Sequence, residues 1–261
     1  MEIVNIYKRI LSIFNPSLSS LKSKTGITFV GVGPGDPKLL TIAAVEAIKK
    51  ATLVAYPVAK LGSKSMASEI ACSFIKNKKC LPIVFPMITD NEALKRAWAF
   101  GANKLIEEVK KGEEVVLLSQ GDPSLYSTSA YILLEIKSNF PLIPLKVIPG
   151  ISSFNAAAAE AQFPLSLQKE ELLICAVPDN PNHLKEMLDN AIKTKRVLVL
   201  IKLGKRWEWV RKVLDEKGLL TKTLFAKRIG FADQLTIKAN NISNEEAPYF
   251  SLLIIREDAI F

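Results

Sequence analysis

The chain has 261 residues, of which 49% are hydrophobic and 23% are charged, and it carries a formal net charge of +9 at pH 7. This is the composition of a globular protein, and no uninterrupted apolar run reaches the roughly 18 residues that a membrane-spanning helix needs, so we expect no membrane partner. Three dispersed cysteines indicate a reducing, cytoplasmic compartment, and a single histidine, His183, excludes a His-rich metal site and disfavours a histidine-based catalytic pair, so we expect no bound metal.

The positive charge has two explanations. Lysines at apparent helix ends, as at Lys49–Lys50 and Lys110–Lys111, complement the helix dipole and would simply give a Lys-rich solvated surface. The other explanation is a polyanionic small-molecule substrate. The sequence shows no interleaving of aromatic and basic residues, no zinc-ligand spacing and no RNA-binding signature, so we expect no nucleic-acid partner.

Residues 1–24 stand apart from the rest of the chain. They carry four cations against one acid, Glu2, and end in a Ser-rich stretch over 17–23. The apolar part, 10–14, is short for a signal peptide. We expect a loosely ordered extension that is dispensable for folding and turnover, with an organelle transit segment as the alternative.

A regular alternation of elements begins at Gly26. A strand over 27–30 runs into a Gly- and Pro-rich turn, after which Asp36 is expected to cap a helix with Pro37 at its first position. Apolar residues from Leu40 to Ala51 share one face of that helix. Further strands are expected at 53–56, 81–85 and 114–119, and further helices at 66–75 and from a cap at Asp90 to 111. This β-α-β-α-β order predicts a mainly parallel sheet covered by helices.

A boundary between two halves is expected at the Pro-containing segment 141–144. The chain would then comprise the extension 1–24, an N-terminal α/β domain over 25–140 and a C-terminal α/β domain over 141–261. The second half is expected to contain strands at 145–148, 172–177, 197–202, 223–228, 234–239 and 249–255, and helices at 154–161, 184–192 and 207–217. The fold class is therefore α/β with two domains, the second built on a mixed sheet.

Three Gly- and Pro-containing loops each follow an expected strand: the first loop over 31–37, the second loop over 121–127 and the third loop over 149–153. In an open parallel sheet the carboxyl ends of the strands face one crevice, and ligands bind there. Glycine lets the backbone approach a ligand closely, and proline reduces the entropy lost on binding. Together the three loops predict a preformed ligand cleft.

The first loop is a poor dinucleotide-binding motif. Pro34 lies inside its glycine cluster and lacks the N–H group with which a phosphate cradle binds. The sequence also lacks a GxxxxGK[ST] loop. NAD-dependent and nucleotide-hydrolysing functions are therefore disfavoured.

The run from Gly31 to Thr41, followed by the Gly121-Asp122-Pro123 motif and the 149–153 turn, resembles the tetrapyrrole methylase family over roughly residues 26 to 258. The resemblance implies a two-domain α/β fold, a homodimer, and S-adenosylmethionine held between the domains. The cofactor-binding positions that the resemblance implies are Pro34, Gln120, Gly121, Asp122, Leu125, Ser152, Ser153, Ile201, Lys202, Ile229 and Gly230.

Two residues of the second loop have a candidate chemical role. The Asp122 carboxylate is suited to accept hydrogen bonds from the cofactor and to face its positive charge, and an Asx turn or helix cap is the structural alternative. Asp122, Tyr126 or solvent is expected to assist proton loss from the methylated carbon, with a packing role as the alternative for Tyr126. Methyl transfer from a sulfonium requires alignment more than a catalytic triad, and the sequence shows no triad.

Within the family, Tyr56–Pro57, the 119–123 context and the segment from Pro248 to Leu253 resemble the branch that methylates precorrin-2 at C-20. Uroporphyrinogen methylases commonly carry aspartate where this chain has Pro57, which counts against that reaction. The implied substrate is a tetrapyrrole polycarboxylate, with or without cobalt, which would also explain the positive charge. Candidate carboxylate-binding residues, on position alone, are Lys202, Lys205, Arg206 and Arg228.

Three alternatives remain open at this point. The chain could methylate uroporphyrinogen or another precorrin position. It could act on diphthamide or ribosomal RNA, in which case an extended basic groove is expected. It could also be a non-catalytic sensor of an adenine-containing ligand, which would bind the cofactor without turnover.

Overall fold

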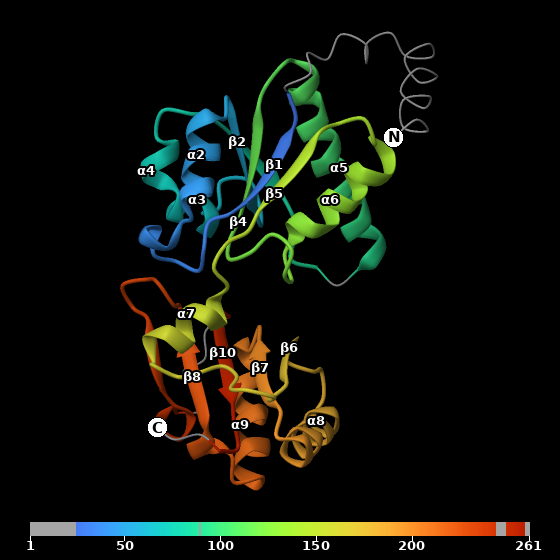
Figure 1. Ribbon diagram of the computed structural model, residues 1–261. Coiled ribbons are helices and arrows are strands. Elements are labelled where there is room, and N and C mark those ends of the chain that lie inside the picture. Colours follow the sequence, from blue (N-terminus) through green and yellow to red (C-terminus); the bar gives the residue numbers. More distant parts are fainter. Residues whose placement is uncertain (1–24, 89, 244–248, 259–261) are drawn as a thin grey trace. The chain divides into compact units, whose positions relative to one another are not determined.

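The computed structural model describes residues 25–88, 90–243 and 249–258, and the chain divides into two compact units, one ending at Ile151 and the other beginning at Ser152 (Figure 1). The expected extension 1–24 lies outside the described residues. The division falls later than the expected boundary at 140/141, because the strand over 145–148 pairs with the first strand of the chain and so belongs to the first unit.

The first unit contains a five-stranded sheet in the order β3-β2-β4-β1-β5, and every pair in it is parallel. Because all strands run in one direction, their carboxyl ends and the loops that follow them share one edge. The alternating strand and helix pattern expected from the sequence is confirmed. The strands are β1 (Ile27–Gly31), β2 (Leu53–Val58), β3 (Lys79–Val84), β4 (Val115–Ser119) and β5 (Leu145–Ile148).

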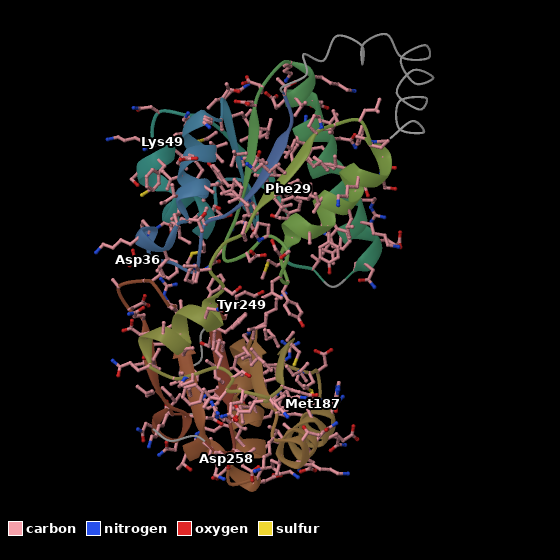
Figure 2. All side chains as sticks on the ribbon, in the orientation of Figure 1. Phe29, Asp36, Lys49, Met187, Tyr249 and Asp258 are labelled. Carbon is pink, nitrogen blue, oxygen red and sulfur yellow. The ribbon has the colours of Figure 1, made fainter. Side chains whose placement is uncertain are left out.

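Helices cover both faces of this sheet, with α5 and α6 on one side and α2, α3 and α4 on the other (Figure 1). Phe29, which is fully buried, packs with Leu117 from the sheet and with Leu105 and Ile106 from α5 (Figure 2). The sequence predicted no helix in the region of α6. The helices are α2 (Ile42–Lys50), α3 (Met66–Ile70), α4 (Cys72–Ile75), α5 (Asn91–Lys110) and α6 (Thr128–Asn139).

The start of the first helix differs from the expectation. Asp36 caps only a short 3-10 turn, Pro37–Leu39, in which its side chain accepts a hydrogen bond from the N–H of Lys38 at 2.8 Å. The extended backbone of Leu40 then ends the helical conformation. Thr41 caps α2, because its side chain accepts a hydrogen bond from the N–H of Ala44. The helix therefore begins at Ile42, because Thr41 provides a second capping side chain after the one at Asp36. The expected cap of α5 at Asp90 is confirmed.

The second unit contains a five-stranded mixed sheet, as expected, and its strand order is β6-β7-β10-β8-β9. Strands β6 and β7 are parallel, and the other pairs are antiparallel. Since β10 runs against both of its neighbours, the ends of β7 and β8 lie beside the start of β10. The strands are β6 (Leu172–Ala176), β7 (Val197–Ile201), β8 (Thr223–Lys227), β9 (Leu235–Lys238) and β10 (Ser251–Ile255).

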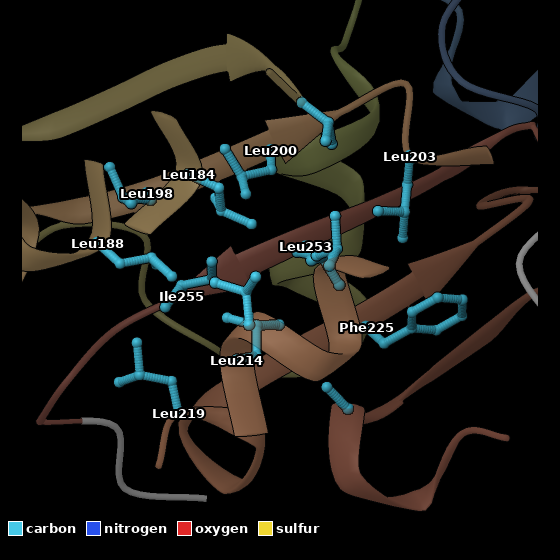
Figure 3. Close-up of a cluster of buried hydrophobic side chains, with 14 of the residues drawn as sticks. Leu184, Leu188, Leu198, Leu200, Leu203, Leu214, Leu219, Phe225, Leu253 and Ile255 are labelled. Atoms are coloured by element: carbon cyan, nitrogen blue, oxygen red, sulfur yellow. The ribbon is translucent and has the colours of Figure 1, made fainter. Parts of the chain in front are cut away.

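The core of the second unit lies between its sheet and two helices, α8 (Pro181–Thr194) and α9 (Trp207–Glu216), as the close-up in Figure 3 shows. Leu184 and Leu188 of α8 are fully buried in it. A third helix, α7 (Ser153–Glu160), opens the unit. Among the described residues, no helix is long and apolar enough to cross a membrane.

Candidate cofactor and active site

The first and second loops are joined at the carboxyl edge of the first sheet. The N–H of Gly121 donates to the carbonyl of Gly33 at 2.8 Å, and the N–H of Gly33 returns a bond to Gly121 at 3.3 Å. Both glycines have positive φ, 78° at Gly33 and 67° at Gly121, a conformation that other residues rarely adopt. The two loops therefore form one continuous backbone platform.

The third loop packs against this platform through backbone atoms. A Cβ on Gly31 would lie 2.5 Å from the nitrogen of Gly150, and a Cβ on Gly150 would lie 2.1 Å from the carbonyl oxygen of Gly121. No side chain fits at such distances, so glycine is required for loop-on-loop contact at these two positions. Gly121 differs, because a Cβ there would meet nothing within 4 Å, and its backbone therefore faces open space.

Asp122 links the second and third loops. Its Oδ2 accepts a hydrogen bond from the N–H of Gly150 at 2.9 Å, and its Oδ1 accepts from the N–H of Ser124 at 2.8 Å and from the Ser124 hydroxyl. The bond to the Ser124 N–H is the Asx turn that the sequence left as an alternative. A carboxylate has about four acceptor positions, so these bonds leave capacity for one further donor.

The predicted positions of the first unit lie together on this platform. The side-chain amide of Gln120 donates to the carbonyl of Pro34 at 3.2 Å, which ties the second loop to the first. The N–H of Leu125 is directed to the carbonyl of Asp122 at 3.4 Å. Pro34 is thus brought to the second loop by a contact between residues far apart in the sequence, while Gln120, Gly121, Asp122 and Leu125 lie together in or directly before that loop.

Tyr126 lies at the end of the second loop with its side chain 46% exposed. Its φ of 50° places a non-glycine residue in the left-handed region, where strain tends to accumulate near functional sites. The exposure disfavours a simple packing role for Tyr126.

A serine pair that was not predicted from the sequence holds the far end of this loop. Ser119, which is buried at the end of β4, has its Oγ 2.6 Å from the Oγ of Ser127. Ser127 also accepts from the N–H of Ser129 and so caps α6. The signal that could have revealed this cap is a serine five residues before Ile132, the first of two buried apolar residues at helical spacing, Ile132 and Ile136.

In the second unit, the predicted positions fall into two groups. Ser152 and Ser153 form the start of α7, and the Ser152 side chain makes no capping hydrogen bond to its own helix. Ile201 and Lys202 end β7, while Ile229 and Gly230 follow β8.

The strand-end group is held by backbone bonds to the chain around the start of β10. The N–H of Leu203 donates to Ser251 at 3.2 Å, and the N–H of Arg228 donates to Phe250 at 2.9 Å. Lys202 has a φ of 59° and Gly230 a φ of 86°, and the Gly230 N–H donates to the side chain of Gln234 at 2.8 Å. The structure therefore brings Ile201, Lys202, Ile229 and Gly230 to one end of the second sheet.

The residues that suggested a family branch lie in defined places. Pro57 lies near the carboxyl end of β2, beside Tyr56, whose pKa is raised by burial and secondarily by the nearby Cys80 thiol. Tyr249 and Phe250 directly precede β10, and Pro248 lies outside the described residues.

One groove in the described part of the chain lies apart from the predicted site residues. A groove of about 340 Å³ is lined by residues such as Gly26, Glu114 and Lys146 at the amino ends of the first sheet, and it contains none of the predicted site residues. In the same described ranges, no group of three or more His, Cys, Asp or Glu side chains could hold a metal ion.

Comparison with known proteins identifies the family. The family model described as Tetrapyrrole (Corrin/Porphyrin) Methylases matches residues 26–242. The chain belongs to the tetrapyrrole methylase family. The sequence of this tetrapyrrole methylase is 34% identical, over 236 residues, to that of the probable cobalt-precorrin-2 C(20)-methyltransferase of Methanocaldococcus jannaschii. The match covers 87% of this chain and 94% of that protein.

Solved structures show the same fold. The crystal structure of the methyltransferase CobJ matches this methylase with a TM-score of 0.66 and 19% identity, covering 90% of this chain and 95% of the other. A Thermus thermophilus uroporphyrin-III C-methyltransferase complexed with S-adenosyl homocysteine matches with a TM-score of 0.58 and 20% identity, covering 89% of this chain and 97% of the other. The predicted two-domain α/β methylase fold is therefore confirmed.

Proposed function

We propose that this tetrapyrrole methylase transfers a methyl group from S-adenosylmethionine to C-20 of precorrin-2 or of its cobalt-containing form. The observation that carries the proposal is the match, along nearly the whole of both chains, to a relative named for C-20 methylation of cobalt-precorrin-2. Pro57 adds support, because uroporphyrinogen methylases commonly carry aspartate there.

The geometry of the first unit fits a methyl donor. Gly121 offers an open backbone, and Asp122, whose oxygens hold the platform, contributes a negative charge beside it. S-adenosylmethionine supplies an electrophilic methyl group on a positively charged sulfur, and a nearby carboxylate complements that charge. We assign Pro34, Gln120, Gly121, Asp122 and Leu125 to its binding.

The second unit contributes the remaining cofactor positions in this proposal. The side chain of Ser152 makes no capping hydrogen bond, so its hydroxyl group, that of Ser153 and the N–H groups at the start of α7 can bind the cofactor. The strand ends offer backbone groups at Ile201, Lys202, Ile229 and Gly230, two of which have positive φ.

The chemistry asks the protein mainly for alignment. When the methyl group leaves the sulfonium, the sulfur departs as a neutral thioether and needs little stabilisation. The rate therefore depends on holding the nucleophilic carbon, the methyl group and the sulfur in line, which can lower the activation barrier by about 7–11 kcal/mol. The bonds that join the three loops fix the platform on which this alignment depends. We assign the proton from the methylated carbon to the Asp122 carboxylate or to solvent, with Tyr126 as the alternative, in which its hydroxyl accepts that proton while passing its own proton to solvent.

The protein's charge and thiols support the remaining assignments. A net charge of +9 suits a substrate that carries acetate and propionate groups. Cys72 and Cys80 are exposed free thiols, which fits a reducing, cytoplasmic compartment. We further propose a homodimer, on the resemblance to the family.

Product analysis tests the proposed activity. The purified protein is incubated with S-adenosylmethionine and either precorrin-2 or its cobalt form, and the products are separated and weighed by mass spectrometry. We expect one added methyl group on the macrocycle and one S-adenosylhomocysteine released for each. Binding of the cofactor without any methylated product from either macrocycle would contradict the proposal and favour a sensor.

A further inference from the structure

Two aromatic side chains lie exposed where β10 begins. Tyr249, which Figure 2 labels, is 48% exposed and Phe250 is 40% exposed. Their rings meet edge to face with centroids 5.1 Å apart. Aromatic side chains of this size normally bury their faces. We call Tyr249 and Phe250 the aromatic pair.

The backbone holds the aromatic pair between two strand ends. The N–H of Arg228, after β8, donates to the carbonyl of Phe250 at 2.9 Å. On the other side, after β7, a Cβ on Gly204 would lie 3.7 Å from the Cα of Tyr249. The backbone of the pair is therefore held at one end of the second sheet, and a backbone held in place lowers the entropic cost of binding.

Strained cationic residues flank the aromatic pair. Lys202 and Arg228 are non-glycine residues in the left-handed region, with φ of 59° and 48°. Each follows a strand that borders β10, and such strain is a feature of binding and active sites. Arg228 is further oriented by a 2.7 Å bond from its Nε to the Asp233 carboxylate and by the ring of Phe231 at 4.7 Å.

The chemistry of this edge selects one kind of ligand. Exposed aromatic faces favour a flat, apolar ring system, and a guanidinium and an ammonium group favour carboxylates around its rim. The proposed substrate has both properties. The methyl donor has a planar adenine but carries a positive sulfur, so we assign to it only the backbone groups of Lys202 and assign the ammonium group to the substrate.

We propose that Tyr249 and Phe250 bind the macrocycle of the tetrapyrrole polycarboxylate, one ring by its face and the other by its edge because the two rings are perpendicular, while Lys202 and Arg228 pair with its carboxylate groups. The inference rests on the proposed function for the identity of the substrate. It adds two residues, Tyr249 and Phe250, that select the substrate and that do not hold the methyl donor.

Binding measurements without turnover test this inference. Uroporphyrin, a fluorescent planar octacarboxylate, serves as the probe for the macrocycle, and S-adenosylhomocysteine, measured by calorimetry, serves as the probe for the donor site. We expect Tyr249→Ala and Phe250→Ala each to weaken uroporphyrin binding by about tenfold, with S-adenosylhomocysteine affinity changed less than about twofold.

Leu167→Ala is the matched control. Leu167 is 50% exposed and precedes Glu170, which pairs with Arg256 at the opposite end of β10 from the aromatic pair. The control should bind both probes as the unaltered protein does, and circular dichroism should show that all three variants are folded.

Three results would overturn the inference: no uroporphyrin binding by the unaltered protein, unchanged uroporphyrin binding by the variants, or a loss confined to S-adenosylhomocysteine. Failure of the proposed function has a different signature. In that case uroporphyrin binding would still depend on Tyr249 and Phe250, but no methyl group would be transferred to precorrin-2.

Discussion

The Oδ2 atom of Asp122 accepts a hydrogen bond from the backbone N–H of Gly150 at 2.9 Å, so that one carboxylate in the second loop holds the third loop in place. The same side chain closes its own loop through Ser124. Asp122 therefore has a positioning role in the platform, which is separate from any contact it makes with the cofactor.

Replacing Asp122 should affect both stability and ligand binding. We expect Asp122→Ala to lower the free energy of unfolding by about 1.5–3 kcal/mol, the usual worth of hydrogen bonds to a charged group, and to weaken S-adenosylhomocysteine binding. Asp122→Asn should fall between Ala and the unaltered protein, because its carbonyl can keep one of the bonds. Denaturant unfolding and calorimetry measure the two effects.

Ser124→Ala is the control for the Asp122 variants. It removes the hydroxyl bond to Oδ1 but retains the backbone bonds from Ser124 and Gly150, so we expect a smaller loss of stability. Equal stability and equal ligand affinity in Asp122→Ala and the unaltered protein would show that the carboxylate neither positions the loops nor binds the cofactor.

Gly150→Ala should separate the loops. The added Cβ would lie 2.1 Å from the Gly121 carbonyl oxygen, and the clash is with backbone, which cannot rotate away. We expect a loss of stability of about 1–3 kcal/mol and weaker S-adenosylhomocysteine binding.

Gly62→Ala provides a comparison for this variant. Gly62 has a φ of 79° and open space around its Cβ position, so its substitution costs backbone strain alone. It should leave ligand affinity unchanged, and a Gly150 variant with the same normal affinity would argue against a role for the third loop.

Much of this platform was predictable from the sequence, because its signals are local. Gly and Pro motifs that follow strands identified all three loops, and Asp90 identified the start of α5. The bonds between the loops were not predictable, since the contact of Gly31 with Gly150 depends on the pairing of β1 with β5.

The errors also have physical causes. Helix α6 was not predicted because apolar residues such as Tyr131 and Leu134 also lie on its exposed face, which weakens the helical periodicity of its sequence. The start of α2 was misplaced because the Asp36–Pro37 signal was satisfied by a single 3-10 turn.

An ion-pair cluster at the amino end of the first sheet should make stability depend on pH. Lys79 bonds Glu108 at 2.7 Å and Glu113 at 2.9 Å. Hydrogen bonds from Lys111 and Lys79 lower the pKa of Glu108, and bonds from Thr52 and Lys79 lower the pKa of Glu113. Because both folded-state pKa values lie below the unfolded ones, their contribution to stability is present above about pH 4.5 and is lost as the pH falls through the folded-state values.

Melting temperatures across pH 3 to 7 measure this contribution. The double variant Glu108→Gln/Glu113→Gln should lose less melting temperature on acidification than the unaltered protein does. Glu107→Gln, which removes a pair with Lys104 between exposed side chains, should behave like the unaltered protein. If the melting temperatures of all three proteins fell equally on acidification, the ion-pair cluster would not contribute to the pH dependence of stability.

Residues 1–24 should be dispensable. The family match begins at residue 26, after this segment. We expect a chain that starts at Thr25 to keep its melting temperature within about 3 °C and to keep its rate of methyl transfer. Lost solubility or activity in the shortened chain would show that the segment contributes to the folded protein or to its assembly.

The position of the transferred methyl group tests the central claim most directly. S-adenosylmethionine labelled with carbon-13 in its methyl group is used with precorrin-2, and the isolated product is read by NMR. Because a displacement of about 1 Å can cost on the order of 100-fold in rate, one position should dominate. The account predicts a single labelled methyl on the meso carbon C-20, and a label on a pyrrole ring carbon would contradict it.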